Sequence, residues 1–516
     1  CGDEQPGTMR MEARMNAIAR TRQGRVEGRE KEGVLLFAGI PYASPPTGDA
    51  RFRPPRPHPA WEGVRPAKRF GKVAPQIPSP LGGFLDALNL DWDEDCLTLN
   101  VATPALDDTP RPVMVWIHGG AFLTGTSATP WYNGTSFARR GDVVVVSINY
   151  RLGALGFLHL GERCEELARS GNSGILDQIA ALEWVRDNIG CFGGDPDNVT
   201  IFGESAGGMS VATLLGVPAA KGLFQKAIPQ SGACHNSVSR EVAARVAELF
   251  SEKAGASDAE ELRRLPVEKI LEAQTSTILT LASDRGVIGD ERRLLLGLAF
   301  QPVVDGEVLP KPPIEAVREG AAADVALLTG TNLDEAHLFL IANPPKLDRT
   351  KLVKRLDRVF GAGARVLDTY ASSRPEASED DLFSAICTDE TFRIPAIRLA
   401  EAQSAHQEST YLYLFTWASR AFGGRLGACH ALEIPFVFNN LSRGGVEAFL
   451  GKGTPPTRLA EAMHEAWIAF AHRGEPDHPG IDHWPAFEIS RRATMEFGER
   501  IGIIDDPNAS ERELWD

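Results

Sequence analysis

The sequence has no long uninterrupted apolar run. Its most strongly apolar stretch, Val143-Val144-Val145-Val146, is far shorter than the roughly 18 residues that a membrane-spanning helix needs. We expect this stretch to be a buried strand. The chain begins Cys1-Gly2-Asp3-Glu4 with no apolar segment behind it, so neither a secretory signal nor an integral membrane segment is expected.

Metal-binding and disulfide patterns are also missing. The seven cysteines form no CxxC pair and no zinc spacing. His464-Glu465 resembles the start of a zinc motif, but Ile468 stands where the second histidine would be. We therefore expect no metal site. We also expect free, mostly buried thiols, which fit a reducing, cytoplasmic compartment.

The chain carries fewer positively than negatively charged side chains. Lysine and arginine number 54 against 69 aspartates and glutamates, so the net charge is −15. Such a chain repels phosphate backbones and anionic membrane surfaces. Nucleic acid is therefore not an expected partner, whereas the oligomeric state is left open by the sequence.

The first 14 residues are polar and lack periodicity, so we expect them to form a flexible N-terminal extension. Met15-Asn16-Ala17-Ile18 is typical of a natural enzyme start, which favours Cys1 being a remnant ahead of it. The alternative is that Cys1 is an acylated, processed N-terminus, which would imply a lipoprotein or a secreted form.

From residue 15 to residue 516, strand and helix patterns alternate without a repeat or a low-complexity linker. Although 516 residues exceed the usual single domain, this pattern predicts one large α/β domain with helical insertions. A short antiparallel hairpin is expected over 25–38. Further strands are expected at 97–102, 113–117, 142–148, 199–202, 325–328 and 411–415, and helices at 174–189, 209–215 and much of 240–320 and 348–407.

One short motif carries the first sign of chemistry. Gly203-Glu204-Ser205-Ala206-Gly207 matches G-x-S-x-G and lies between an expected strand and an expected helix. That context is the one a nucleophile elbow requires, because the sharp turn exposes the serine and the glycines allow close approach. The pattern predicts Ser205 as a nucleophile.

A second motif, His118-Gly119-Gly120, directly follows the expected strand 113–117. Acyl transfer needs preorganised donors for the oxyanion of its tetrahedral intermediate. Two glycines in a loop allow consecutive N–H groups to point into a site, and Ala206 after the nucleophile would add another. The sequence thus predicts an oxyanion hole at Gly119, Gly120 and Ala206, with His118 ordering the loop.

A serine nucleophile also needs a base and an orienting acid. His430 follows the expected strand 411–415, and Asp334 and Glu335 follow the expected strand 325–328. Catalytic groups gather at the carboxyl ends of strands in such sheets. His430 is therefore the expected base, whereas strand and spacing arguments leave Asp334 and Glu335 as equal candidates for the acid.

At these residues the chain resembles the type-B carboxylesterases, a family that includes cholinesterases and bacterial p-nitrobenzyl esterases. The resemblance extends from about Gly24 to Phe487. It is carried by ordered blocks that begin at Phe37, Glu94, His118, Gly171, Phe192, Gly203, Gly330 and His430.

The resemblance implies an α/β-hydrolase fold with a mostly parallel central sheet and helical insertions that form the substrate cleft. It implies a serine carboxylesterase that hydrolyses small-molecule carboxylic esters through an acyl-enzyme and needs no cofactor. The triad would be Ser205, Glu335 and His430. It further implies a supporting role for Ser231, and structural ion pairs at Arg51 with Glu94 and at Arg151 with Asp177.

The chain departs from the family at two points. Animal relatives pair the cysteine at position 96 with one upstream, but residues 2–95 contain no cysteine, so Cys96 is expected to be free. Ala336 stands where glycine is usual. Two alternatives share the fold: a catalytically silent binding or adhesion module, which the presence of all three triad candidates disfavours, and an amidase or lactonase that uses the same triad.

Overall fold

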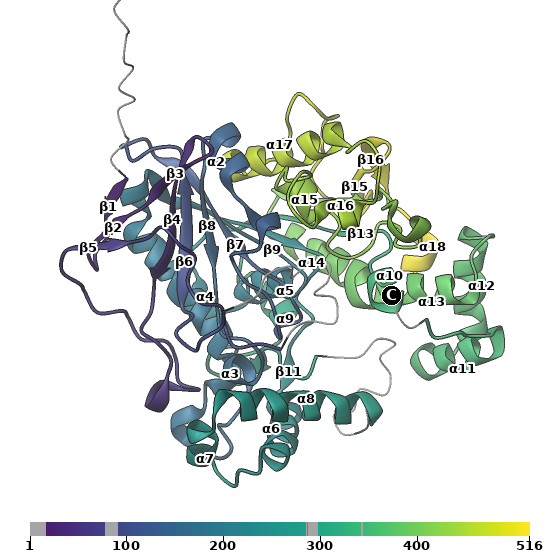
Figure 1. The fold of residues 1–516 in the computed structure, drawn as a ribbon. Coiled ribbons are helices and arrows are strands. Elements are labelled where there is room, and N and C mark those ends of the chain that lie inside the picture. The colour runs from purple at the N-terminus through teal and green to yellow at the C-terminus, as the bar shows by residue number, and fades with distance from the viewer. Residues whose placement is uncertain (1–16, 78–90, 285, 287–297, 342–343) are drawn as a thin grey trace, which may run out of the picture.

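The computed structural model describes residues 17–77, 91–284, 286, 298–341 and 344–516. The expected extension of residues 1–14 lies outside the described residues. Within them, an 11-stranded sheet runs through the molecule (Figure 1). From edge to edge its strands are β16 (Ile501–Asp505), β15 (Ala493–Phe497), β14 (Thr410–Phe415), β13 (Ala326–Asn332), β10 (Lys226–Gln230), β9 (Gly194–Glu204), β7 (Arg111–Ile117), β8 (Val144–Ile148), β6 (Thr98–Thr103), β4 (Val34–Pro41) and β3 (Arg29–Lys31).

The middle of this sheet is parallel. All neighbouring pairs from β15 to β8 run parallel, whereas the strands at the two edges are antiparallel. Parallel strands bring their carboxyl ends to one edge, where catalytic groups gather in such sheets. Ser205, Asn332 and Ser231 each follow directly on one of these strand ends or lie at it.

Both faces of the sheet are buried, which explains the continuous apolar runs of its strands. In β7, Val113, Val115 and Ile117 join one hydrophobic core, while Met114 and Trp116 join the other. The first core is covered by α3 (Gly153–Phe157), α4 (Ser173–Asn188), α5 (Ala206–Leu214), α6 (Arg240–Ala254), α7 (Ala259–Arg264), α8 (Val267–Ser283), α9 (Pro313–Arg318) and α14 (Ile394–Ser404). The second is covered by α2 (Thr135–Gly141), α10 (His337–Leu340), α15 (Ile434–Val437), α16 (Val446–Leu450) and α17 (Thr457–Arg473).

Helical insertions extend the sheet core. Helices α11 (Arg349–Phe360), α12 (Gly363–Ser373) and α13 (Glu379–Thr388) enclose a separate apolar cluster and project from the side of the molecule opposite β3 and β4 (Figure 1). A π-helical turn, Asp389–Arg393, joins α13 to α14, and α18 (Ala509–Arg512) contacts α12. Two small sheets complete the fold: β1 (Ile18–Arg20), β2 (Arg25–Glu27) and β5 (Val64–Pro66), and β11 (Val238–Ser239) with β12 (Val303–Val304).

The expected strands all form, with ends shifted by a few residues. The expected hairpin is β3 with β4, and the helix expected at 209–215 begins earlier, at Ala206. The structure adds β10, β15 and β16, which the sequence patterns did not predict. No helix among the described residues is long and apolar enough to cross a membrane.

Candidate active site

Ser205 lies in a strained turn between β9 and α5. Its backbone angles are φ 56° and ψ −126°, a conformation that residues other than glycine rarely adopt. Its N–H donates to the carbonyl oxygen of Gln230 at 3.0 Å. A Cβ at Gly207 would lie 2.0 Å from the carbonyl oxygen of Ile117, so only glycine fits there. The turn therefore has the sharpness and the small neighbours that the motif predicts.

The His-Gly-Gly loop lies against this turn. A Cβ at Gly119 would be 2.5 Å from the carbonyl oxygen of Glu204 and 3.1 Å from Cβ of Ser205. Gly120 has a φ of +111°, and its own Cβ would clash with Thr124. Gly119 and Gly120 thus follow a path that a side chain would block, close to Ser205. Ala206, the third expected donor, is the buried first residue of α5.

His118 is held in place as part of this loop. Its ring stacks on Tyr150 with centroids 4.6 Å apart, and the Tyr150 hydroxyl donates to its carbonyl oxygen at 2.8 Å. Burial lowers the pKa of His118 to about 4, so the ring is neutral at pH 7. These contacts fit the expected role of ordering the loop.

The two acid candidates have different partners. Oε2 of Glu335 lies 2.6 Å from Nδ1 of His430, and Oε1 of Glu335 accepts from the Asn332 N–H at 2.7 Å. Asp334 instead accepts from the Ala428 N–H at 2.8 Å and so braces the loop that carries His430. The structure thus brings Glu335, and not Asp334, to the histidine ring.

His430 is buried between two carboxyl groups. Its Nε2 lies 3.1 Å from Oε1 of Glu204 in an ion-pair contact, and it hydrogen-bonds to none of the described residues. Burial lowers the pKa of His430, but the negative charges of Glu204 and Glu335 outweigh this effect and raise it to about 9. Burial raises the pKa of Glu204 well above its ordinary value. The pKa of each of these two groups therefore depends on the charge of the other.

Two glutamates in the site had no role in the sequence interpretation. Glu204 was part of the Ser205 motif, and Glu433 follows His430 by three residues. Both are buried, at 3% and 0% exposure. A buried carboxyl group is costly unless it is paired, so an acidic residue directly before the nucleophile or one turn after the base was a signal that could have identified them.

Two aromatic rings flank His430. Phe392, in the π-helical turn, and Phe339, in α10, have centroids 4.8 and 5.0 Å from the imidazole. Their planes are nearly parallel, at 5°. Phe392 is buried, whereas Phe339 is 40% exposed. Phe339 thus presents an exposed apolar ring beside the histidine, the kind of surface that commonly lines ligand sites.

Other residues named by the resemblance have structural contacts. Arg51 pairs with Glu94 at 2.6 Å and Arg151 with Asp177 at 2.7 Å, so both predicted ion pairs are confirmed. Cys96 is buried and forms no disulfide, as predicted. The hydroxyl of Ser231 is buried near the site but has no hydrogen-bond partner among the described residues. Among the described residues, the structure therefore shows no hydrogen bond through which Ser231 would support the triad.

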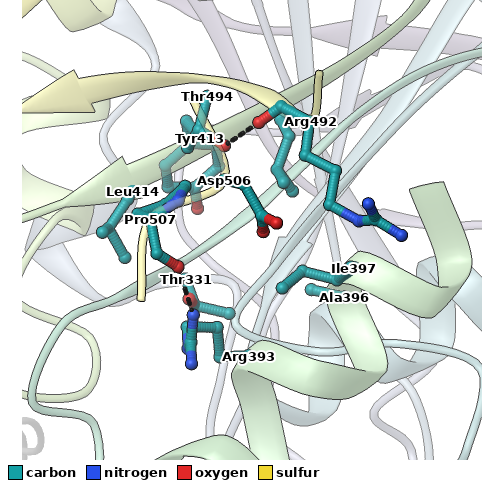
Figure 2. A pocket seen from close by; sticks show the side chains of 11 residues that line it. Thr331, Arg393, Ala396, Ile397, Tyr413, Leu414, Arg492, Thr494, Asp506 and Pro507 are labelled. Carbon is teal, nitrogen blue, oxygen red and sulfur yellow. Dashed lines mark hydrogen bonds between the residues drawn. The ribbon is translucent and has the colours of Figure 1, made fainter. Parts of the chain in front are cut away.

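A small cavity lies nearby, between α14 and the strands β13, β14 and β15 (Figure 2). Its volume of about 20 Å³ holds about one water molecule. The guanidinium groups of Arg393 and Arg492 line it, but they are bonded to Asp389 and to Glu401. Neither arginine is available to a ligand, and the cavity is too small for an ester, so it is not the candidate site.

Comparison with known proteins gives a family match over nearly the whole chain. The model of the carboxylesterase family matches residues 15–515. The chain is 40% identical to the para-nitrobenzyl esterase of Bacillus subtilis over 506 residues, which cover 96% of this chain and 98% of that protein. It is 36% identical to the phenmedipham hydrolase of Pseudarthrobacter oxydans, covering 93% and 95% of the two chains.

Solved structures give the same relationship. A carboxylesterase of Geobacillus stearothermophilus superposes with a TM-score of 0.85 at 42% identity, covering 97% of this chain and all of that one. A structure of p-nitrobenzyl esterase has a TM-score of 0.85 at 39% identity, covering 97% and 99%. The architecture predicted from the sequence, an α/β-hydrolase fold, is confirmed by these likenesses together with the mostly parallel sheet.

Proposed function

The chain belongs to the carboxylesterase family and is a carboxylic-ester hydrolase, and from this premise we propose that Ser205 is its nucleophile, His430 its general base and Glu335 the acid that orients the base. The observation that carries the assignment is the bond of 2.6 Å between Nδ1 of His430 and Oε2 of Glu335, both buried. Such a bond fixes the ring orientation and stabilises the imidazolium that forms during acyl transfer.

The reaction proceeds in two halves. Nε2 of His430 takes the proton of the Ser205 hydroxyl, and Oγ attacks the ester carbonyl carbon. The tetrahedral intermediate collapses, the bond to the alcohol oxygen breaks, and the alcohol leaves with the proton from His430. Water then attacks the acyl-enzyme with His430 as base, and the acid product and free Ser205 are released.

The oxyanion of each intermediate is bound by the backbone N–H groups of Gly119, Gly120 and Ala206. Support comes from the contact of Gly119 with the Ser205 turn and from the position of Ala206 at the start of α5. The partial positive charge at the N-terminus of this nine-residue helix points toward the same oxygen. Donors of this kind contribute roughly 3–4 kcal/mol each to the lowering of the barrier.

Replacing Ser205 tests the nucleophile directly. We expect Ser205→Ala to lower kcat for a p-nitrophenyl ester by a factor of about 10³ or more, because the acyl-enzyme can no longer form. Ser276→Ala, on the exposed face of α8, is the matched control and should keep the wild-type rate. Ester hydrolysis near the wild-type rate in Ser205→Ala would contradict the assignment.

We also propose that residues 15–516 form one domain and that the enzyme acts on small esters in a reducing, cytoplasmic compartment. The single domain is supported by the large sheet, whose described strands extend from Arg29 to Asp505 along the chain. The compartment is supported by the buried, unbridged thiol of Cys96.

A further inference from the structure

One buried carboxyl group near the site has no part in the proposed reaction. Glu433 is fully buried, one turn after His430. Its Oε1 accepts from Nε2 of Gln230 at 3.0 Å, and its Oε2 accepts from Nδ2 of Asn332 at 2.7 Å. Two amide donors therefore bind this one carboxyl group. Among the described residues, its side chain forms no hydrogen bond to Glu335 or to the ring of His430.

Neither side-chain amide can exchange the positions of its oxygen and nitrogen without losing a hydrogen bond. Oε1 of Gln230 accepts from the indole N–H of Trp467 at 3.1 Å, so Nε2 of Gln230 is the atom that must face Glu433. Nδ2 of Asn332 also donates to the carbonyl oxygen of Cys429 at 2.8 Å, so it too faces the carboxyl group with a donor. A side chain at position 433 therefore has to accept twice, which an ionised carboxylate does and an amide does not.

Gln230 and Asn332 also form hydrogen bonds to the reacting residues. The carbonyl oxygen of Gln230 accepts the Ser205 N–H at 3.0 Å. The Asn332 N–H donates to Glu335 at 2.7 Å, and its side chain binds the residue directly before His430. Glu433 is thus connected through Gln230 to the turn of the nucleophile, and through Asn332 to the end of the strand that leads to the acid.

We propose that Glu433 is a positioning residue that fixes Ser205, Glu335 and His430 relative to one another by binding the amides of Gln230 and Asn332. This proposal rests on the proposed function, because it takes those three residues to be the triad. Small misplacements of reacting groups are costly: a shift of about 1 Å can lower a rate by about 100-fold.

The protonation state of Glu433 bears on this role. Burial, followed by the negative charge of Glu335, raises the pKa of Glu433 to about 7, against the bonds from Asn332 and Gln230 that lower it. A neutral carboxylic acid loses one acceptor, so the connection weakens below pH 7. The titratable groups around it are Glu204 at the end of β9, Glu335 after β13, Tyr413 of β14, and Cys429 and His430 of its own loop.

Glu433→Gln tests the proposal, because it keeps the shape and removes one acceptor. At pH 8.5 we expect kcat for a p-nitrophenyl ester to fall about 10- to 100-fold with KM within about twofold, since geometry and not ground-state binding is affected. At pH 6, where the wild-type group is also neutral, the ratio of wild-type to variant kcat should be clearly smaller.

Trp467→Phe supplies a rescue. This variant frees Gln230 to rotate its amide, so that Oε1 can accept from the new amide at position 433. We expect the kcat of the double variant Glu433→Gln/Trp467→Phe to be at least about threefold higher than that of Glu433→Gln alone. A merely structural role would lower stability in both single variants and give no recovery.

Wild-type kcat in Glu433→Gln at pH 8.5, or a double variant no better than Glu433→Gln, overturns the proposal. If Glu433→Gln does not fold, Glu433→Asp replaces it: the shorter carboxylate cannot reach both amides, so an unchanged kcat in that variant also overturns the proposal. Ser205→Ala distinguishes the two proposals. If the triad assignment is wrong, Ser205→Ala retains activity. If only the Glu433 proposal is wrong, Ser205→Ala is still inactive.

Discussion

Nε2 of His430 lies 3.1 Å from Oε1 of Glu204, on the nitrogen opposite the one that Glu335 binds. The nitrogen that takes the proton of Ser205 in the proposed reaction thus rests against a buried carboxyl group. In that reaction the ring has to exchange Glu204 for the Ser205 hydroxyl. Glu204 is therefore placed to control when the imidazole is neutral.

The pH profile should report this contact. His430 must be neutral to accept a proton, and its pKa is raised from 6.5 to about 9, so the acid limb of kcat/KM should lie above pH 6.5. Glu204→Gln removes the largest of the three carboxylate charges that raise this pKa, those of Glu204, Glu335 and Glu433, and the acid limb should shift to lower pH. An acid limb in Glu204→Gln that coincides with that of the wild type would show that the contact does not affect the base.

The two neighbouring carboxylates should differ sharply in their effect on turnover. Glu335→Gln removes the charge that stabilises the imidazolium, and we expect kcat to fall at least about 100-fold, since the analogous change in serine proteases costs about 10⁴-fold. Asp334→Asn is the matched control: it weakens the bond to the Ala428 N–H but does not touch the ring. If both variants lost kcat equally with the same ester, the assignment of Glu335 as the acid would be wrong.

The glycine of the oxyanion loop should not tolerate a side chain. Gly119→Ala would place a Cβ 2.5 Å from the Glu204 carbonyl oxygen and push the loop from the Ser205 turn. We expect kcat to fall about 10²- to 10³-fold, as when an oxyanion donor is lost. Gly190→Ala, whose Cβ meets nothing within 4 Å, is the control and should keep full activity. An active Gly119→Ala enzyme would exclude this loop from the oxyanion hole.

The buried ion pair of Arg151 and Asp177 should matter for stability. Asp177 is completely buried, and Asp177→Asn leaves the guanidinium without its charge partner. We expect a loss of about 3–5 kcal/mol in the free energy of unfolding, measured in urea. Glu272→Gln breaks the exposed pair with Lys269 and should cost at most about 1 kcal/mol. A similar small loss in both would refute the distinction.

The sequence predicted the central strands and the site motifs because each is a local pattern. Apolar β-branched runs form β7 and β8, and the glycines around Ser205 are required by close backbone contacts. Strand β10 was missed because Lys226, Pro229 and Gln230 are unusual in a central parallel strand. It forms because its neighbours β9 and β13 pair with it on both sides.

The environment of the base could not be predicted in this way. Phe392 contacts His430 from a π-helical turn between α13 and α14, an irregularity that the sequence pattern did not predict. Gln230 and Asn332 meet Glu433 across sequence separations of 203 and 101 residues. Such contacts depend on how the strand ends are arranged in space, which residue spacing does not encode.

The central claim is that Ser205 carries the acyl group, and covalent labelling tests it most directly. The wild-type enzyme is treated with an organophosphate, digested, and mapped by mass spectrometry while residual esterase activity is followed. We predict one label per chain, on the peptide containing Ser205, with activity lost in proportion to labelling. Full inactivation with the label on another residue, or undiminished activity with Ser205 fully labelled, would contradict the account.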